Sequence, residues 1–221
     1  MLSACIFDLD GTLIDSGRLH YFAFRETVSR EYGLEYLESD FYPLYGRSAE
    51  EIIKPFLQNN GIDASLSKEF ADKRRDVLKK QLGEVTSIPL LSGAIQTLDT
   101  LKDAGFKLAL ATGNRRVNGE IMVEKAGLKK YFPVRIYHDD ISRGKPDPEI
   151  FLKAAQELGF EPKECAVFED SVHGVESAKS AGMKVVAVAS GGHTLKDLSG
   201  KKPDLTLKTL KDFKINQLNG L

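Results

Sequence analysis

Short apolar runs recur along this chain, and each is followed by a turn residue or a polar cluster. They cover residues 4–7, 108–111, 134–137, 165–168, 183–189 and 204–207. Runs of this length between turn signals are typical of buried strands. Helical stretches between them end at Gly105 and Gly182, where glycine supplies the left-handed conformation that stops a helix. The alternation predicts an α/β fold, a Rossmann-like parallel sheet with helices on both faces.

Residues 16–87 lack this alternation. Two sets of apolar residues there have helical spacing, namely Leu19, Phe22, Ala23 and Val28, then Leu66, Phe70, Val77, Leu78 and Leu82. Such spacing indicates amphipathic helices. We therefore expect a core formed by 1–15 and 88–221 and a small all-helical domain, 16–87, inserted after the first strand. The linkers near 15–17 and 87–91 would be its hinges. Asp147 and Pro148 predict the start of a core helix that continues to Leu158.

Two carboxylates, Asp8 and Asp10, follow the first predicted strand directly. Side chains two residues apart on a strand point the same way. Like charges this close are costly unless a cation lies between them or one carries a proton. The pair therefore predicts a metal site, a nucleophile with an acid, or both. A solvated acidic turn is the alternative.

Polar clusters also follow three later strands. They are Thr112-Gly113-Asn114, Gly144-Lys145-Pro146 and Glu169-Asp170. Taken singly, Thr112 could cap a helix, Lys145 could be an exposed loop lysine, and the acids could complement a helix dipole. In open α/β sheets, however, ligands bind outside the carboxyl ends of the strands. Four clusters at such ends indicate one convergent site.

With Asp8-Leu9-Asp10-Gly11-Thr12, Thr112, Lys145-Pro146 and Glu169-Asp170 in this order, the chain resembles the haloacid dehalogenase-like (HAD) hydrolase superfamily. The resemblance covers nearly all 221 residues. It implies that residues 16–87 are the helical cap of the β-phosphoglucomutase-like branch. It also adds the backbone carbonyl of Asp10 to the expected metal ligands, and a direct or indirect metal role for Glu169.

The residue types fit phosphoryl transfer. A carboxylate nucleophile needs a cation beside it, because the phosphoryl group that it attacks is also negatively charged. Asp8 and Asp170 offer the oxygen ligands that Mg²⁺ prefers. We expect Asp8 to form an aspartyl-phosphate and Asp10 to act as general acid and base. Thr112 and Lys145 would hold the transferring oxygens. Backbone N–H groups of residues 112–114, ahead of a helix, suit an anion, so Gly113 and Asn114 are candidate substrate contacts.

Cap residues give weaker signals. His20 falls near the first hinge, where mutase relatives have a histidine that approaches the active site, but an exposed helical histidine is the alternative. Arg47 lies in a predicted cap loop and could contact substrate. One residue of the basic run 73–75 could reach the distal end of the substrate. Three further histidines show no ligand spacing and are expected to be structural or exposed: His138, His173 and His193.

We expect hydrolysis of a small phosphate monoester. The first alternative is a hexose-phosphate mutase, but Ala49 stands where such mutases carry an arginine, and Thr112-Gly113-Asn114 replaces their Ser-Ala-Ser loop. Dehalogenation and phosphonate hydrolysis are disfavoured, since Asp10 would have no leaving oxygen to protonate. Inorganic pyrophosphate remains a possible substrate, and a non-catalytic protein that binds a phosphorylated metabolite is a remote alternative.

Composition and charge limit the kinds of binding partner to be expected. A net charge of −1 gives no reason to expect nucleic-acid or membrane binding, and no run is long enough to span a bilayer. Cys5 and Cys165 fall in predicted strands, where free cysteines behave as small apolar residues. We expect a cytoplasmic protein, a monomer, whose partner is its small phosphorylated substrate.

Overall fold

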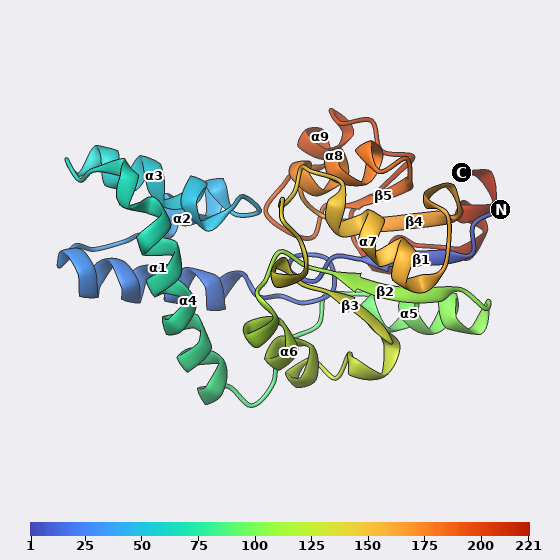
Figure 1. Cartoon of the computed structure of the whole chain (residues 1–221), viewed down its shortest axis with the longest axis horizontal. Helices are drawn as coiled ribbons and strands as arrows, with labels where there is room; N and C mark the ends of the chain where they lie inside the picture. Colours follow the sequence, from blue (N-terminus) through green and yellow to red (C-terminus); the bar gives the residue numbers. More distant parts are fainter.

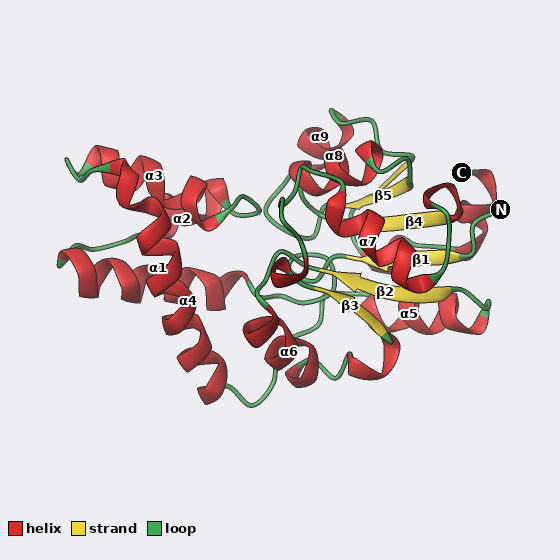
Figure 2. Ribbon diagram, in the orientation of Figure 1, coloured by secondary structure: helices red, strands yellow, loops and turns green.

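A six-stranded parallel sheet forms the centre of the protein. A computed structural model describes residues 1–221, and its strand order is β3-β2-β1-β4-β5-β6 (Figures 1 and 2). The strands are β1 (Ala4–Phe7), β2 (Lys107–Ala111), β3 (Val134–Ile136), β4 (Cys165–Glu169), β5 (Lys184–Val188) and β6 (Leu205–Leu207). The predicted α/β fold is confirmed.

Helices cover both faces of this sheet. They are α5 (Ala94–Asp103), α6 (Arg116–Lys125), α7 (Glu149–Leu158), α8 (Val172–Ser180) and α9 (Leu195–Ser199). Cys5 and Phe7 of β1 belong to the apolar cluster that includes α5 and α6 residues, whereas Ala4 and Ile6 belong to the cluster of α7 and α8. Successive side chains of β1 therefore enter opposite layers, as a doubly covered strand requires.

The strand register brings the predicted motifs to one edge. Phe7 pairs with Leu110 of β2 and with Phe168 of β4, and the Phe7 and Phe168 rings stack 4.4 Å apart. The next residues along these strands are Asp8, Ala111 and Glu169. The chain places β2 and β3 on one side of β1 and then β4, β5 and β6 on its other side. The carboxyl ends of β1 and its neighbours therefore form the switch point at which α/β sheets bind ligands.

Four helices lie apart from the sheet and form the layer called the cap here (Figure 1). They are α1 (Gly17–Tyr32), α2 (Glu38–Phe41), α3 (Ala49–Asn59) and α4 (Ser67–Glu84). The cap has its own apolar core, in which Phe24, Tyr36, Phe41 and Phe70 are buried. The domain boundaries at 15/16 and 87/88 stay a prediction.

The predicted apolar faces of the cap helices are wrong at two positions. Phe22 is 38% exposed, and the Arg18 guanidinium lies 5.7 Å from its ring centre. Leu66 is 36% exposed and precedes α4 in a short 3-10 turn, Ala64–Leu66. Helical spacing identifies the apolar face of a helix, but it does not show which residues at the edge of that face remain exposed to solvent.

The two linkers between the cap and the sheet run side by side. Asp15 N donates to Pro89 O at 2.9 Å, and Leu91 N donates to Leu13 O at 2.9 Å. Among the core helices, α7 begins one residue later than expected, at Glu149, whose N–H donates to Asp147 Oδ1 at 3.0 Å. Asp147 therefore still satisfies a free donor of the first turn. Both cysteines are buried and unpaired, and none of the helices has the length and apolar character needed to cross a bilayer.

Candidate active site

Lys145 joins two carboxylates at the edge of the sheet. Its Nζ donates to Asp8 Oδ1 and to Glu169 Oε1, each at 2.6 Å. The three side chains are 13%, 10% and 1% exposed. Burial lowers the pKa of Lys145, but Asp8 and Glu169 outweigh it, so the pKa lies above the usual lysine value. Lys145 is therefore a fixed cation beside Asp8.

Glu169 is held at the start of α8. Its Oε2 accepts from Ser171 N at 2.6 Å while Oε1 accepts from Lys145. A Cβ on Gly174 would lie 1.8 Å from Glu169 Oε1, so only glycine leaves room for this carboxylate. Both Glu169 oxygens are thus already engaged by the protein. These contacts show that Glu169 pairs with Lys145, and its direct or indirect metal role stays a prediction.

Asp170 is packed between two glycine backbones. Its Oδ1 accepts from Thr12 Oγ1 at 2.9 Å. A Cβ on Gly11 or Gly191 would lie 2.3 Å or 1.7 Å from Asp170 Oδ2. Burial raises the pKa of Asp170 well above its usual range, and the charges of Glu169 and Asp8 raise it further. The carboxylate is therefore held in a tight cradle that favours its neutral form unless a cation is near.

The charges at this edge fit a divalent cation. Asp8, Glu169 and Asp170 are buried carboxylates, and the Lys145 ammonium pairs with the first two only. Burial also raises the pKa of Asp8 above its usual range; Lys145 opposes the increase, and Glu169 and Asp10 add to it. Asp8 Oδ2 and Asp170 Oδ2 accept from no protein donor. Asp170 Oδ2 is therefore available as a metal ligand. In Asp8, Oδ1 accepts only from Lys145 and keeps a second lone pair for a cation, while Oδ2 is free to attack.

No group of three His, Cys, Asp or Glu side chains is placed to hold a metal ion by itself. Mg²⁺ commonly binds through one or two carboxylates and completes its shell with water and substrate oxygens. The donor set of Asp8 and Asp170, with one backbone carbonyl, is of that kind. The residues present therefore fit the expected ion.

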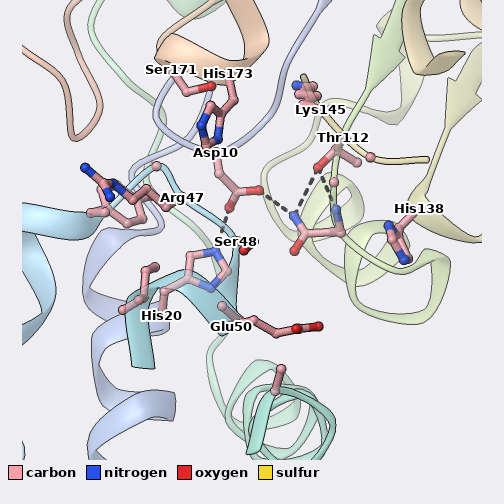
Figure 3. Close-up of a pocket in the computed structure, with 18 of the residues that line it drawn as sticks. Asp10, His20, Arg47, Ser48, Glu50, Thr112, His138, Lys145, Ser171 and His173 are labelled. Atoms are coloured by element: carbon pink, nitrogen blue, oxygen red, sulfur yellow. Dashed lines mark hydrogen bonds and ion pairs between the residues drawn. The ribbon is translucent and has the colours of Figure 1, made fainter. Parts of the chain in front are cut away.

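Asp10 lies at the centre of a set of donors (Figure 3). Its Oδ1 accepts from His20 Nε2 at 2.9 Å and from Ser16 Oγ, and its Oδ2 accepts from Asn114 Nδ2. Burial raises the pKa of Asp10, but His20 and these hydrogen bonds outweigh it, so the pKa lies below its usual range. Asp10 is thus held as a carboxylate, the form of a general base.

Arg74 fixes the tautomer of His20. Its Nη2 and Nη1 lie 3.2 Å and 3.4 Å from His20 Nδ1. Because a guanidinium can only donate, Nδ1 must accept, and the ring proton must lie on Nε2, which faces Asp10. The Arg74 guanidinium is 5.0 Å from the Phe24 ring centre, and burial lowers the pKa of Arg74 to about 10. One residue of the run 73–75 was expected to reach the substrate; Arg74 is buried and lines the pocket.

Thr112 presents a free hydroxyl proton to the site. Its Oγ1 accepts from Asn114 N at 3.2 Å and from Asn114 Nδ2 at 3.1 Å. With its lone pairs engaged, the O–H can donate to an anionic oxygen. Thr112 N donates to Ile136 O at 3.0 Å. Of the three N–H groups expected to bind an anion, only that of Gly113 therefore has no protein acceptor.

A pocket of about 360 Å³ lies between the cap and the core. Every residue proposed from sequence as catalytic or substrate-binding lines it, as do Glu169 and Asp170. Figure 3 labels Asp10, Thr112 and Lys145 among them. Several lining residues were not foreseen: Tyr45, Ser48, Glu50, Asn118 and the histidines 138 and 173. The sequence does not indicate that these residues line the pocket, because this depends on how the cap packs against the core. Lys73, by contrast, is exposed and pairs with Glu69 and Glu31.

The chain is similar to known proteins along nearly its whole length. The family described as "Haloacid dehalogenase-like hydrolase" matches residues 5–188. A "Phosphorylated carbohydrates phosphatase" of Thermotoga maritima is 33% identical, covering 96% of this chain and 99% of that protein. A "Beta-phosphoglucomutase" of Bacillus subtilis is 30% identical, covering 96% and 95%. The crystal structure of a HAD hydrolase, family IA, variant 3, from Entamoeba histolytica has a TM-score of 0.84 and 31% identity, covering 98% and 97%.

Proposed function

Because the chain belongs to the haloacid dehalogenase-like hydrolase family, we propose that it is a Mg²⁺-dependent phosphatase that hydrolyses a small phosphorylated sugar through an aspartyl-phosphate on Asp8. Phosphoric monoester hydrolysis is the activity that the family and the phosphatase relative support. The observation that carries the residue roles is the Asp8 carboxylate, with one oxygen on Lys145 and the other available to attack. The cytoplasmic location and the monomeric state stay predictions.

In the first half-reaction, Asp8 Oδ2 attacks phosphorus and the bond from phosphorus to the leaving oxygen breaks. Lys145 and the Thr112 hydroxyl would hold the transferring oxygens, whose charge grows in the transition state. The Asp10 carboxyl would give its proton to the leaving oxygen. Because an incoming phosphate dianion raises the pKa of a nearby carboxyl, substrate binding itself favours the protonated form of Asp10 that this step needs.

In the second half-reaction, the Asp10 carboxylate takes a proton from water, and the water oxygen attacks phosphorus. The bond between phosphorus and Asp8 then breaks, and inorganic phosphate leaves. The donors from His20, Ser16 and Asn114 keep Asp10 ionised, which supports this base role. Mg²⁺ bound by Asp8, Asp170 and the Asp10 carbonyl would offset the negative charge of the phosphoryl group.

The shape and charge of the pocket support a sugar-sized substrate. Its volume of about 360 Å³ lies at the small end of the range for ligand sites. Arg47, Arg74, Arg75 and Arg115 all line it, together with polar Ser48 and Asn118. Such a wall suits a hydroxylated, anionic molecule better than an apolar one. The phosphatase of phosphorylated carbohydrates from Thermotoga maritima agrees with this substrate class.

The test is phosphate release from a panel of sugar phosphates with and without Mg²⁺. Asp8→Asn should abolish turnover, because an amide cannot replace the nucleophile. Asp103→Asn, an exposed carboxylate at the end of α5, is the matched control and should retain full activity. Absence of Mg²⁺-dependent turnover in the unaltered protein on every substrate would refute the proposal.

The same assay separates hydrolysis from the mutase alternative. With β-glucose 1-phosphate and a bisphosphate primer, a phosphatase releases inorganic phosphate, whereas a mutase forms glucose 6-phosphate. The Bacillus subtilis mutase is a relative over 96% of the chain, so this comparison is needed.

A further inference from the structure

Two loops meet where the cap touches the core on the α8 side. The cap loop is residues 45–48, ahead of α3, and the core loop is residues 190–193, after β5. A Cβ on Gly46 would lie 2.6 Å from Cε1 and 2.8 Å from Nδ1 of His193. A Cβ on Gly192 would lie 2.3 Å from Tyr45 O. Each loop thus places a glycine where the other loop leaves no room for a side chain.

His193 fills the space over Gly46 without hydrogen bonding there. Its Nδ1 is buried and has no partner. Burial lowers the pKa of His193; Arg47 and His173 act in the same direction, and Asp197 and Glu169 oppose them. The ring is therefore neutral at neutral pH and acts by its shape. Since a buried unpartnered nitrogen is unfavourable, the ring owes its place to the packing with Gly46.

The cap loop carries groups that reach the reacting centre. The Tyr45 hydroxyl lies 3.3 Å from Ser16 Oγ, and Ser16 Oγ donates to Asp10. Because Ser16 uses its only proton on Asp10, Tyr45 must donate to Ser16. Arg47 and Ser48 line the pocket. The position of this loop against the core therefore determines where the Tyr45 hydroxyl, which donates to Ser16, and part of the pocket wall lie.

We propose that His193 is a positioning residue: its ring seats the cap loop against the core and so holds Tyr45 on Ser16 and Asp10. This proposal rests on the proposed function, because the contacts that His193 stabilises end on Asp10, the proposed general acid and base. His193 touches no reacting atom in this account. It acts through Gly46 and Tyr45, and its effect is expected on the closed arrangement of cap and core rather than on the nucleophile.

The experiment is a double-mutant cycle between Gly46 and His193. Gly46→Ala should lower kcat/KM about tenfold or more, because displacement of catalytic groups by an ångström is costly. Part of this loss is backbone strain, since Gly46 has a φ of 94°. Gly61→Ala is the matched control: Gly61 is a cap residue with a φ of 69° and has no atom within 4 Å of an added Cβ. It should change kcat/KM less than about twofold.

His193→Ala should lower kcat/KM by several fold, because the loop loses its seat. In this background the ring no longer clashes, so Gly46→Ala should cost only about twofold more, as strain alone does in Gly61→Ala. Hydrogen exchange of the amides of residues 45–48 should quicken about tenfold in His193→Ala, while β1 and β4 stay protected.

An equal loss from Gly46→Ala in both backgrounds would overturn the proposal, as would unchanged exchange of residues 45–48 in His193→Ala. The exchange measurement needs no substrate. It therefore still tests the seat of the loop if the unaltered protein shows no phosphatase activity, a result that would refute the proposed function instead.

Discussion

The Lys145 ammonium offers a direct test of the charge balance at the site. Lys145→Met keeps most of the side-chain volume and removes the cation that is 2.6 Å from both Asp8 and Glu169. These carboxylates are 10% and 1% exposed, so water cannot replace the lost partner. Breaking a buried ion pair by removing one member costs about 3–5 kcal/mol when the remaining charge stays ionised. We expect a loss in this range at pH 8, in buffer without divalent metal.

The loss should change little between pH 5 and pH 8. The pKa of Lys145 is raised in the folded protein, so its contribution is fully present below the ordinary lysine pKa and is constant in this range. Burial already raises the pKa of Asp8 to about 8 beside Lys145, and removal of the cation raises it further. Asp8 therefore takes up its proton in both proteins as the pH falls below 8, and the loss should change by less than about 1 kcal/mol over this range.

Urea unfolding at pH 5, 6, 7 and 8 measures both quantities. Lys184→Met is the matched control, because Lys184 pairs with Asp204 at 3.0 Å but is 41% exposed. A pair of that kind contributes at most about 1 kcal/mol, with little change over this pH range. If Lys145→Met were no more destabilising than Lys184→Met, or if its loss changed by more than about 1 kcal/mol between pH 5 and pH 8, the buried-charge argument would be wrong.

Two further perturbations test the neighbouring carboxylates. Mg²⁺ at about 100 times its Kd should stabilise the unaltered protein by about 2.7 kcal/mol and raise its Tm by about 5 °C or more. The Asp170→Asn variant should lose this gain. Equal shifts of Tm for both proteins in a thermal scan would contradict the metal site. Since the folded pKa of Asp10 is lowered, its stabilising contribution is present above the ordinary Asp pKa of about 4 and is lost as the pH falls through the folded value. Asp10→Asn should therefore flatten the loss of stability between about pH 5 and pH 3 in denaturant titrations, and parallel curves would count against the donor set around Asp10.

The sheet and its edge could be predicted from sequence because their signals are local. Each strand is an apolar run, and most motifs lie at a strand end: Asp8 follows Phe7 of β1, and Glu169 is the last residue of β4. Lys145 is the exception, since a loop separates it from β3. Parallel pairing then brings the strand ends together without any further information. This reasoning needed neither the loop conformations nor the cap.

The contacts between cap and core could not be predicted in this way. Arg74 meets His20 from another helix, and His193 meets Gly46 across an interface, so no spacing along the chain encodes either contact. Glu169 provides a third example, since its two fixed oxygens depend on the absence of a side chain at Gly174. The sequence shows that these residue types are present, but not that they lie together.

The division between core and cap also bears on which acceptor takes the phosphoryl group. In the proposed mechanism, Asp8, Lys145 and Thr112 act on phosphorus alone, so they would serve transfer to water and to a sugar hydroxyl equally well. The acceptor must instead lie beside Asp10, which removes its proton. Two of the three donors to Asp10, Ser16 and His20, belong to the first linker and α1, and they are backed by Tyr45 and Arg74 of the cap. Changes in these residues should therefore alter the ratio of hydrolysis to transfer, whereas changes in the core residues should reduce both reactions together.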